Sequence, residues 1–279
     1  MARATDPTSF EVSSQNAVLR GETAGDGPPI VTLHGLTATR RYVVHGSTSL
    51  PRAGYWTVAY DARGHGESDA PSDRSAYDYA DLVGDLRAVL DGLEIGRAVL
   101  AGVSMGAHTA VRLALEDPGR VAGLVLITPA FAGAGSDAER WDSGLADALE
   151  RDGVEGFISA WGGEGVADRW REAALENARQ RLERHRDLRA VADALRVVPG
   201  SVPFDGLDSL RSIDAPTLVV GSRDEADPIH PLSVAEDYAE RLPRGELLVE
   251  DEGKSPLAWQ GARLSKAIAE WARREKPQQ

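Results

Sequence analysis

Residues 98–106 read Ala-Val-Leu-Ala-Gly-Val-Ser-Met-Gly, and this stretch decides the fold. Small and β-branched apolar residues run directly into Gly102-Val103-Ser104-Met105-Gly106, and apolar residues at helical spacing follow. The pattern predicts a strand, a sharp turn and a helix, the arrangement called a nucleophile elbow. Glycines are needed on both sides of the serine because larger side chains would collide with the neighbouring strand and helix. Ser104 would then stand exposed above the sheet, beside the positive end of the helix dipole.

Strand and helix patterns alternate on both sides of this stretch. Continuous apolar runs, which a parallel sheet buries on both faces, predict strands at 30–33, 56–60, 121–127, 216–221 and 246–249. Weak alternation over residues 8–24 predicts one or two antiparallel edge strands. Helical spacing predicts helices near 42–44, at 79–93, at 232–242 and at the end of the chain. We therefore expect an α/β protein with a mostly parallel central sheet flanked by helices.

The alternation stops for a long stretch between residues 132 and 213. Such a stretch is far longer than an ordinary connection, and it is rich in helical spacing. We interpret residues 132–213 as a helical cap inserted into a core made of residues 1–131 and 214–279. The cap tryptophans at positions 141, 161 and 170 are interpreted as packing residues of the cap.

Composition excludes several classes of protein. The 279 residues, 42% apolar and 27% charged, suit a globular protein with one sizeable core and an insertion. A formal net charge of −13 argues against nucleic acid or an anionic membrane as a partner. The absence of cysteine excludes disulfides, thiol catalysis and cysteine metal sites. With no apolar leader and no bilayer-long apolar run, we predict a cytoplasmic monomer or homodimer that acts on a small molecule.

The whole chain resembles the capped, serine-nucleophile branch of the α/β-hydrolase family. The resemblance rests on motifs that occur in the family's order: His34-Gly35, Gly64-His65-Gly66-Glu67-Ser68, Gly102 to Gly106, Thr128-Pro129, and Gly221-Ser222-Arg223-Asp224. It implies hydrolysis of a small carboxylic ester, lactone or related carbonyl compound through an acyl-enzyme on Ser104. It also implies an oxyanion hole made by the backbone amides of Met105 and Leu36, with His34 and Gly35 bordering the substrate.

No metal or organic cofactor is implied. The chain has no His-Glu-x-x-His sequence, and its glycine clusters do not form a dinucleotide-binding fingerprint.

Two aspartates are candidates for the acid of the resemblance. Asp224 has the family's spacing from Gly221, whereas Asp227 has the family's spacing to the next helix. We favour Asp224 slightly. The family also expects a histidine after the last strand, where this chain has Lys254, and no histidine follows His230. Because serine at its ordinary pKa is a poor nucleophile, the identity of the base becomes the main question.

Three interpretations of the base stay open. His230 could reach over Ser104 from the loop that carries the acid. Lys254 could act as the base if burial lowered its pKa, although the acidic residues 250–252 oppose this. The site could instead have lost serine hydrolysis, which leaves a non-hydrolytic ligand-binding protein, or a cofactor-free lyase or carbon–carbon bond hydrolase, on the same scaffold.

The other histidines receive structural interpretations. By the resemblance, His65 belongs to a structural turn. His108 lies one helical turn after Ser104 and is interpreted as a packing histidine. His45 and His185 carry no motif and are interpreted as ordinary loop and cap residues.

Overall fold

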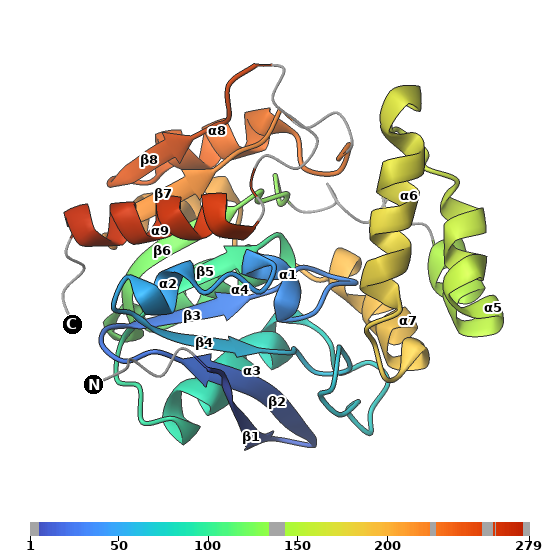
Figure 1. Ribbon diagram of the computed structural model, residues 1–279, viewed down its shortest axis with the longest axis horizontal. Helices are drawn as coiled ribbons and strands as arrows, with labels where there is room; N and C mark the ends of the chain where they lie inside the picture. The colour runs from blue at the N-terminus through green and yellow to red at the C-terminus, as the bar shows by residue number, and fades with distance from the viewer. Residues whose placement is uncertain (1–5, 134–142, 224–226, 253–258, 260, 276–279) are drawn as a thin grey trace.

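A single mixed sheet organises the protein (Figure 1). The computed structural model describes residues 6–133, 143–223, 227–252, 259 and 261–275. Within these residues, eight strands are ordered β1-β2-β4-β3-β5-β6-β7-β8. Their bounds are β1 Thr8–Ser14, β2 Ala17–Ala24, β3 Pro29–Leu33, β4 Trp56–Tyr60, β5 Ala98–Val103, β6 Val121–Ile127, β7 Thr217–Val220 and β8 Gly245–Leu248. β1 pairs antiparallel with β2, and β2 pairs antiparallel with β4. The strands β4, β3, β5, β6, β7 and β8 pair parallel in that order, so the predicted mostly parallel sheet is confirmed.

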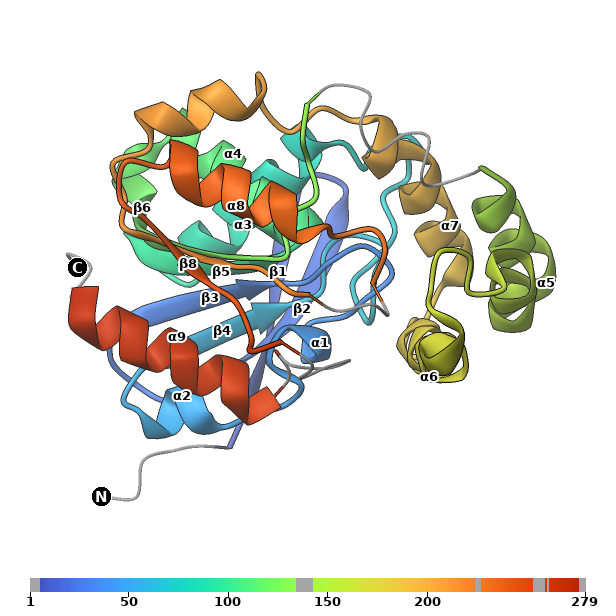
Figure 2. The same ribbon diagram turned by 90° about the horizontal axis from the view of Figure 1, so that it is seen from above.

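Helices cover both faces of the sheet (Figure 2). One face packs against α3 (Tyr79–Gly92), α4 (Met105–Glu116) and α8 (Leu232–Arg241). The other packs against α1 (Arg41–Val44), α2 (Ser49–Arg52) and α9 (Gly261–Glu275). Successive strand residues point to opposite faces, so Leu218 of β7 enters one core and Val219 the other. The central strands β5 and β6 are buried on both faces, which explains why they are apolar throughout.

Three further helices lie between β6 and β7 in the chain, at the carboxyl end of the parallel strands (Figure 1). They are α5 (Ser143–Trp161, kinked at Gly153), α6 (Asp168–Leu182) and α7 (Leu188–Val197). Their apolar side chains form a cluster of their own, and Trp161 packs against it as predicted. Trp141 lies outside the described residues. The division of the chain into core and cap at residues 132 and 213 stays a prediction.

Shorter elements complete the description. The 3₁₀ turns are η1 (Pro118–Arg120), η2 (Val198–Gly200) and η3 (Leu207–Ser212).

Among the described helices, none combines the length and the apolar character that crossing a membrane requires.

Candidate active site

The strand, turn and helix predicted around Ser104 are confirmed. Ser104 follows β5 with φ 48° and ψ −112°, and α4 begins at the next residue. Its amide donates to the Ile127 carbonyl at 3.0 Å, which fixes the turn against β6. A Cβ atom at Gly102 would overlap the Gly106 carbonyl, and one at Gly106 would overlap the Leu33 carbonyl. Only glycine fits at both positions. The surrounding contacts hold Ser104 in its strained backbone conformation.

The turn after β3 lies beside this serine. A Cβ atom at Gly35 would lie 3.5 Å from the Ser104 Cβ atom. The amide of Ala38 donates to the Gly35 carbonyl at 3.1 Å and closes a four-residue turn over Leu36. Among the described residues, neither the Leu36 amide nor the Met105 amide donates to a backbone carbonyl. Both N–H groups therefore remain available to a ligand at the start of α4.

His34 links this turn to the end of β4 through both nitrogens of its ring. Its Nε2 atom accepts from the Ala62 amide at 2.9 Å, and its Nδ1 atom donates to the Gly35 carbonyl at 2.8 Å. Burial, with a smaller effect from His65, lowers the pKa of His34 to about 3, so the ring is neutral. Both nitrogens are used inside the protein. These hydrogen bonds shape the turn after β3, and the expectation that His34 and Gly35 border the substrate stays a prediction.

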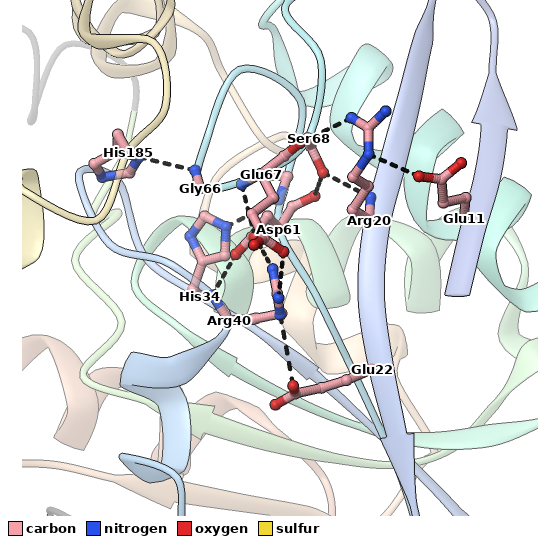
Figure 3. Close-up of polar contacts among 11 residues, drawn as sticks. Glu11, Arg20, Glu22, His34, Arg40, Asp61, Gly66, Glu67, Ser68 and His185 are labelled. Carbon is pink, nitrogen blue, oxygen red and sulfur yellow. Dashed lines mark hydrogen bonds and ion pairs between the residues drawn. The ribbon is translucent and has the colours of Figure 1, made fainter. Parts of the chain in front are cut away.

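A buried carboxylate joins the loops that follow β3 and β4 (Figure 3). Asp61 is 0% exposed and accepts from the backbone amides of Arg40 at 2.7 Å and Glu67 at 3.0 Å. It also forms an ion pair with the Arg40 guanidinium, and its carbonyl accepts from the Ser68 hydroxyl at 2.6 Å. The glycine-rich motif at 64–68 thus wraps a structural carboxylate. His65 is buried in that motif with Nδ1 donating to the Arg63 carbonyl at 2.9 Å, which confirms its interpretation as part of a structural turn.

A histidine and an aspartate pair in the loop between β7 and α8. The Nδ1 atom of His230 lies 2.8 Å from both carboxylate oxygens of Asp227. Burial alone would raise the pKa of Asp227, but the neighbouring His230 and Arg181 outweigh burial and lower it. Asp227 is therefore a carboxylate, and it orients the ring so that Nε2 is the nitrogen left for a proton transfer. Asp224 and Lys254, the other predicted candidates, lie outside the described residues.

His108 is buried on α4, one helical turn after Ser104. Its Nε2 atom accepts from the amides of Ala130 and Phe131, each at 3.1 Å, and its Nδ1 atom bonds the Tyr79 hydroxyl at 2.9 Å. The interpretation of His108 as a packing histidine is confirmed. Burial and then the nearby His230 lower the pKa of His108 to about 3. Ser104 follows β5 and His230 follows β7, so both residues lie beyond the carboxyl ends of parallel strands, at the same end of the sheet.

Two buried polar residues escaped sequence reasoning. Glu250, 3% exposed, accepts from the Ser222 hydroxyl at 2.9 Å and the Arg223 amide at 2.6 Å, so it joins the ends of β7 and β8. His185, interpreted as an ordinary cap residue, is 9% exposed and lies against the His65 ring at 5.5 Å. Glu250 directly follows the strand predicted at 246–249, and a carboxylate at that position was a signal that could have indicated a polar role at the end of the sheet. No pattern marked His185. Among the described residues, no cluster of three or more His, Asp or Glu side chains could hold a metal ion.

Comparison with known proteins gives a consistent assignment. The sequence matches the α/β-hydrolase fold family over residues 28–261. It is 35% identical over 151 residues (51% of this chain, 54% of the relative) to a putative 2-succinyl-6-hydroxy-2,4-cyclohexadiene-1-carboxylate synthase from Bacillus subtilis. It is 30% identical over 213 residues (72% of this chain, 75% of the relative) to a putative carbamate hydrolase from Variovorax paradoxus.

A solved structure described as an N-acyl homoserine lactone degrading enzyme matches 95% of this chain and 99% of its own, at 26% identity and a TM-score of 0.73. The chain spans about half the length of the first curated relatives it matches. The family match runs from the turn before β3 to the start of α9 and includes the elbow, the turn over Leu36 and the loop with His230. The chain therefore belongs to the α/β-hydrolase family, a family of hydrolytic enzymes.

Proposed function

We propose that this protein is a serine hydrolase that cleaves a small carboxylic ester, lactone or related carbonyl compound. Ser104 is the nucleophile, His230 the base and Asp227 the acid. The observation that carries the proposal is the contact of His230 Nδ1 with Asp227 at 2.8 Å. It supports His230 as the base in a chain that has Lys254 where the family resemblance expects the catalytic histidine. This proposal replaces our slight preference for Asp224 as the acid.

The reaction follows from these roles. His230 Nε2 takes the proton of the Ser104 hydroxyl while the Ser104 oxygen bonds to the carbonyl carbon of the substrate. The amides of Leu36 and Met105 donate to the oxyanion that forms, and each such donor contributes roughly 3 kcal/mol to lowering the barrier. The imidazolium returns its proton to the leaving oxygen as the carbon–oxygen bond breaks. Water, deprotonated by His230, then attacks the acyl carbon. The bond from that carbon to the Ser104 oxygen breaks, and the imidazolium returns its proton to this oxygen, so that Asp227 stabilises an imidazolium in both steps.

The substrate class draws on the relatives as well as the site. The relatives described as a putative carbamate hydrolase and as an N-acyl homoserine lactone degrading enzyme support hydrolysis of a carbonyl compound over the lyase, carbon–carbon hydrolase and ligand-binding alternatives. The net charge of −13 supports a small-molecule substrate over a nucleic acid. The site needs no metal or organic cofactor for this mechanism.

Hydrolysis of a series of short p-nitrophenyl acyl esters and acyl lactones tests the proposal. Ser104→Ala and His230→Ala are each expected to lower kcat by at least about 10³-fold with little change in KM. The matched variant Lys254→Ala is expected to stay within about threefold of the parent. Activity that survives Ser104→Ala would reject serine hydrolysis. Loss in Lys254→Ala with activity kept in His230→Ala would make Lys254 the base instead.

A further inference from the structure

The loop between α6 and α7 touches the core at two points close to the candidate site. His185, on this loop, accepts at Nδ1 from the Gly66 amide at 2.9 Å. Its Nε2 atom lies 3.0 Å from the Thr37 carbonyl oxygen. The next residue, Arg186, donates its amide to the Gly66 carbonyl at 3.0 Å. The loop therefore holds both backbone polar groups of Gly66 and one carbonyl of the turn after β3. Figure 3 shows the contact between His185 and Gly66.

The hydrogen bonds define the protonation state of His185. An amide can only donate to an unprotonated nitrogen, so Nδ1 carries no proton. Nε2 then carries the proton of the neutral ring and donates it to the Thr37 carbonyl. Burial, with a smaller effect from His65, lowers the pKa of His185 to about 3. Both nitrogens keep their donor and acceptor roles across the neutral pH range.

Gly66 is a rigid anchor for the ring. Its φ is 52°, and a Cβ atom there would overlap the Asp61 carboxylate. That carboxylate is itself fixed by the Arg40 amide and guanidinium and by the Glu67 amide. The chain at Gly66 has no room to move toward Asp61, so it sets the position of His185.

Thr37 is the strained partner. It has φ 64°, a region that a β-branched residue rarely adopts, and it is 2% exposed. It occupies the third position of the turn that Ala38 closes onto Gly35, where glycine or asparagine is usual. Strain of this kind costs roughly 1–3 kcal/mol and persists only where the surroundings hold it. The hydrogen bond from His185 to its carbonyl is one of the contacts that hold it.

Leu36, the residue before Thr37, joins the two regions. Its side chain packs against the apolar cluster of α5 to α7 and also against the cluster that contains Met105. A turn that relaxed at Thr37 would rotate the peptide that precedes it, and the Leu36 amide would turn with it.

We propose that His185 is a positioning residue, which fixes the turn that carries the Leu36 amide by bridging the Thr37 carbonyl and the Gly66 amide. This inference rests on the proposed function, in which the Leu36 amide stabilises the oxyanion. His185 touches no reacting atom. It makes the orientation of one oxyanion donor depend on how the loop between α6 and α7 sits on the core.

Three variants test this role. His185→Ala removes both hydrogen bonds. His185→Gln keeps one acceptor and one donor. Leu175→Ala, the matched control, truncates a side chain of the α5 to α7 cluster on α6. For each we would measure kcat and KM on a p-nitrophenyl ester, and the NMR signal of the Leu36 amide and hydrogen exchange of the Gly66 amide.

His185→Ala is expected to lower kcat about 10- to 100-fold with KM within about threefold, because one of two oxyanion donors is misaligned but present. It should move or broaden the Leu36 signal and speed Gly66 exchange at least tenfold. His185→Gln should restore most of kcat, and Leu175→Ala should leave the Leu36 signal in place.

The proposal is overturned if His185→Ala leaves either kcat or the Leu36 signal unchanged. It is also overturned if Leu175→Ala reproduces both effects, because general packing of the helices would then suffice. Failure of the proposed function looks different, since Ser104→Ala would then keep the parent's activity. In that case the Leu36 and Gly66 amides still decide whether His185 holds the turn.

Discussion

His230 and Asp227 form a base and acid pair within a single loop, with Nδ1 2.8 Å from both carboxylate oxygens. His230 lies three positions after Asp227 in the sequence, and α8 begins two residues after the histidine. The family resemblance places the base on a different loop, after the last strand. A pair confined to one loop has a fixed mutual geometry, so substitutions of its two members are expected to act together rather than independently.

A double-mutant cycle checks this coupling. Asp227→Asn is expected to lower kcat about 10²- to 10⁴-fold, because the ring loses the carboxylate that fixes its tautomer and stabilises its charge. Asp227→Asn combined with His230→Ala should be no slower than His230→Ala alone. Asp237→Asn on α8, which breaks an exposed ion pair with Arg241, serves as the control and should not change kcat. A larger loss in Asp224→Asn than in Asp227→Asn would assign the acid to Asp224.

The elbow glycines give a stability prediction. Gly106→Ala and Gly102→Ala each force a Cβ atom onto a backbone carbonyl, and each is expected to lower the free energy of unfolding by about 2–4 kcal/mol. Gly96→Ala is the matched control, because a Cβ atom there meets no atom within 4 Å. Urea unfolding should show Gly96→Ala within about 0.5 kcal/mol of the parent. Equal losses at all three positions would contradict the steric explanation.

Acid should destabilise the protein in a defined window. Burial lowers the pKa values of His34, His108 and His185 to about 3, whereas histidine in an unfolded chain has a pKa near 6.5. Between these values the unfolded state binds more protons, so stability is complete above about pH 6.5 and is lost as the pH falls. Each histidine adds a slope of up to about 1.4 kcal/mol per pH unit.

Urea unfolding at pH 7 and pH 5 measures this slope. His185→Gln removes one contributing group, and the slope for that variant should be correspondingly smaller. A free energy of unfolding that is constant from pH 7 to pH 5 would contradict the lowered pKa values, because the folded and unfolded states would then take up equal numbers of protons.

Arg181 on α6 is expected to stabilise the carboxylate of Asp227. Its Nε atom is buried and, in the described part of the chain, has no hydrogen-bond partner. Burial lowers the pKa of Arg181, Asp227 acts in the opposite direction, and Arg181 in turn lowers the pKa of Asp227. Arg181→Met removes one of the two opposite charges, so we expect the free energy of unfolding to fall by at least about 1 kcal/mol. Arg179→Met, which breaks surface ion pairs with Glu155 and Glu176, should change it by less than about 1 kcal/mol. A rise in the free energy of unfolding of Arg181→Met would show that desolvation of the cation outweighs its attraction to Asp227.

Sequence periodicity predicted most of the fold because the strands are buried on both faces. The runs at 56–60 and 121–127 match β4 and β6 residue for residue. The four-residue helix α2 was missed because it is too short to show a period and contains Pro51. A similar limit applies to the site: the elbow is local and visible, whereas His185 binds backbone atoms 119 and 148 residues away. Backbone partners leave no side-chain pattern in a sequence.

The order of the strands also bears on how the protein folds. Leu36, Ser104 and His230 follow β3, β5 and β7, whose neighbours in the sheet run β3-β5-β6-β7. Parallel neighbours are joined by long crossovers, so no short stretch of the chain brings these residues together, and the crossovers must close before the three residues meet. The helices can form from local contacts much earlier. During refolding, ester hydrolysis should therefore return more slowly than the helical circular dichroism signal, and its return would report completion of the sheet.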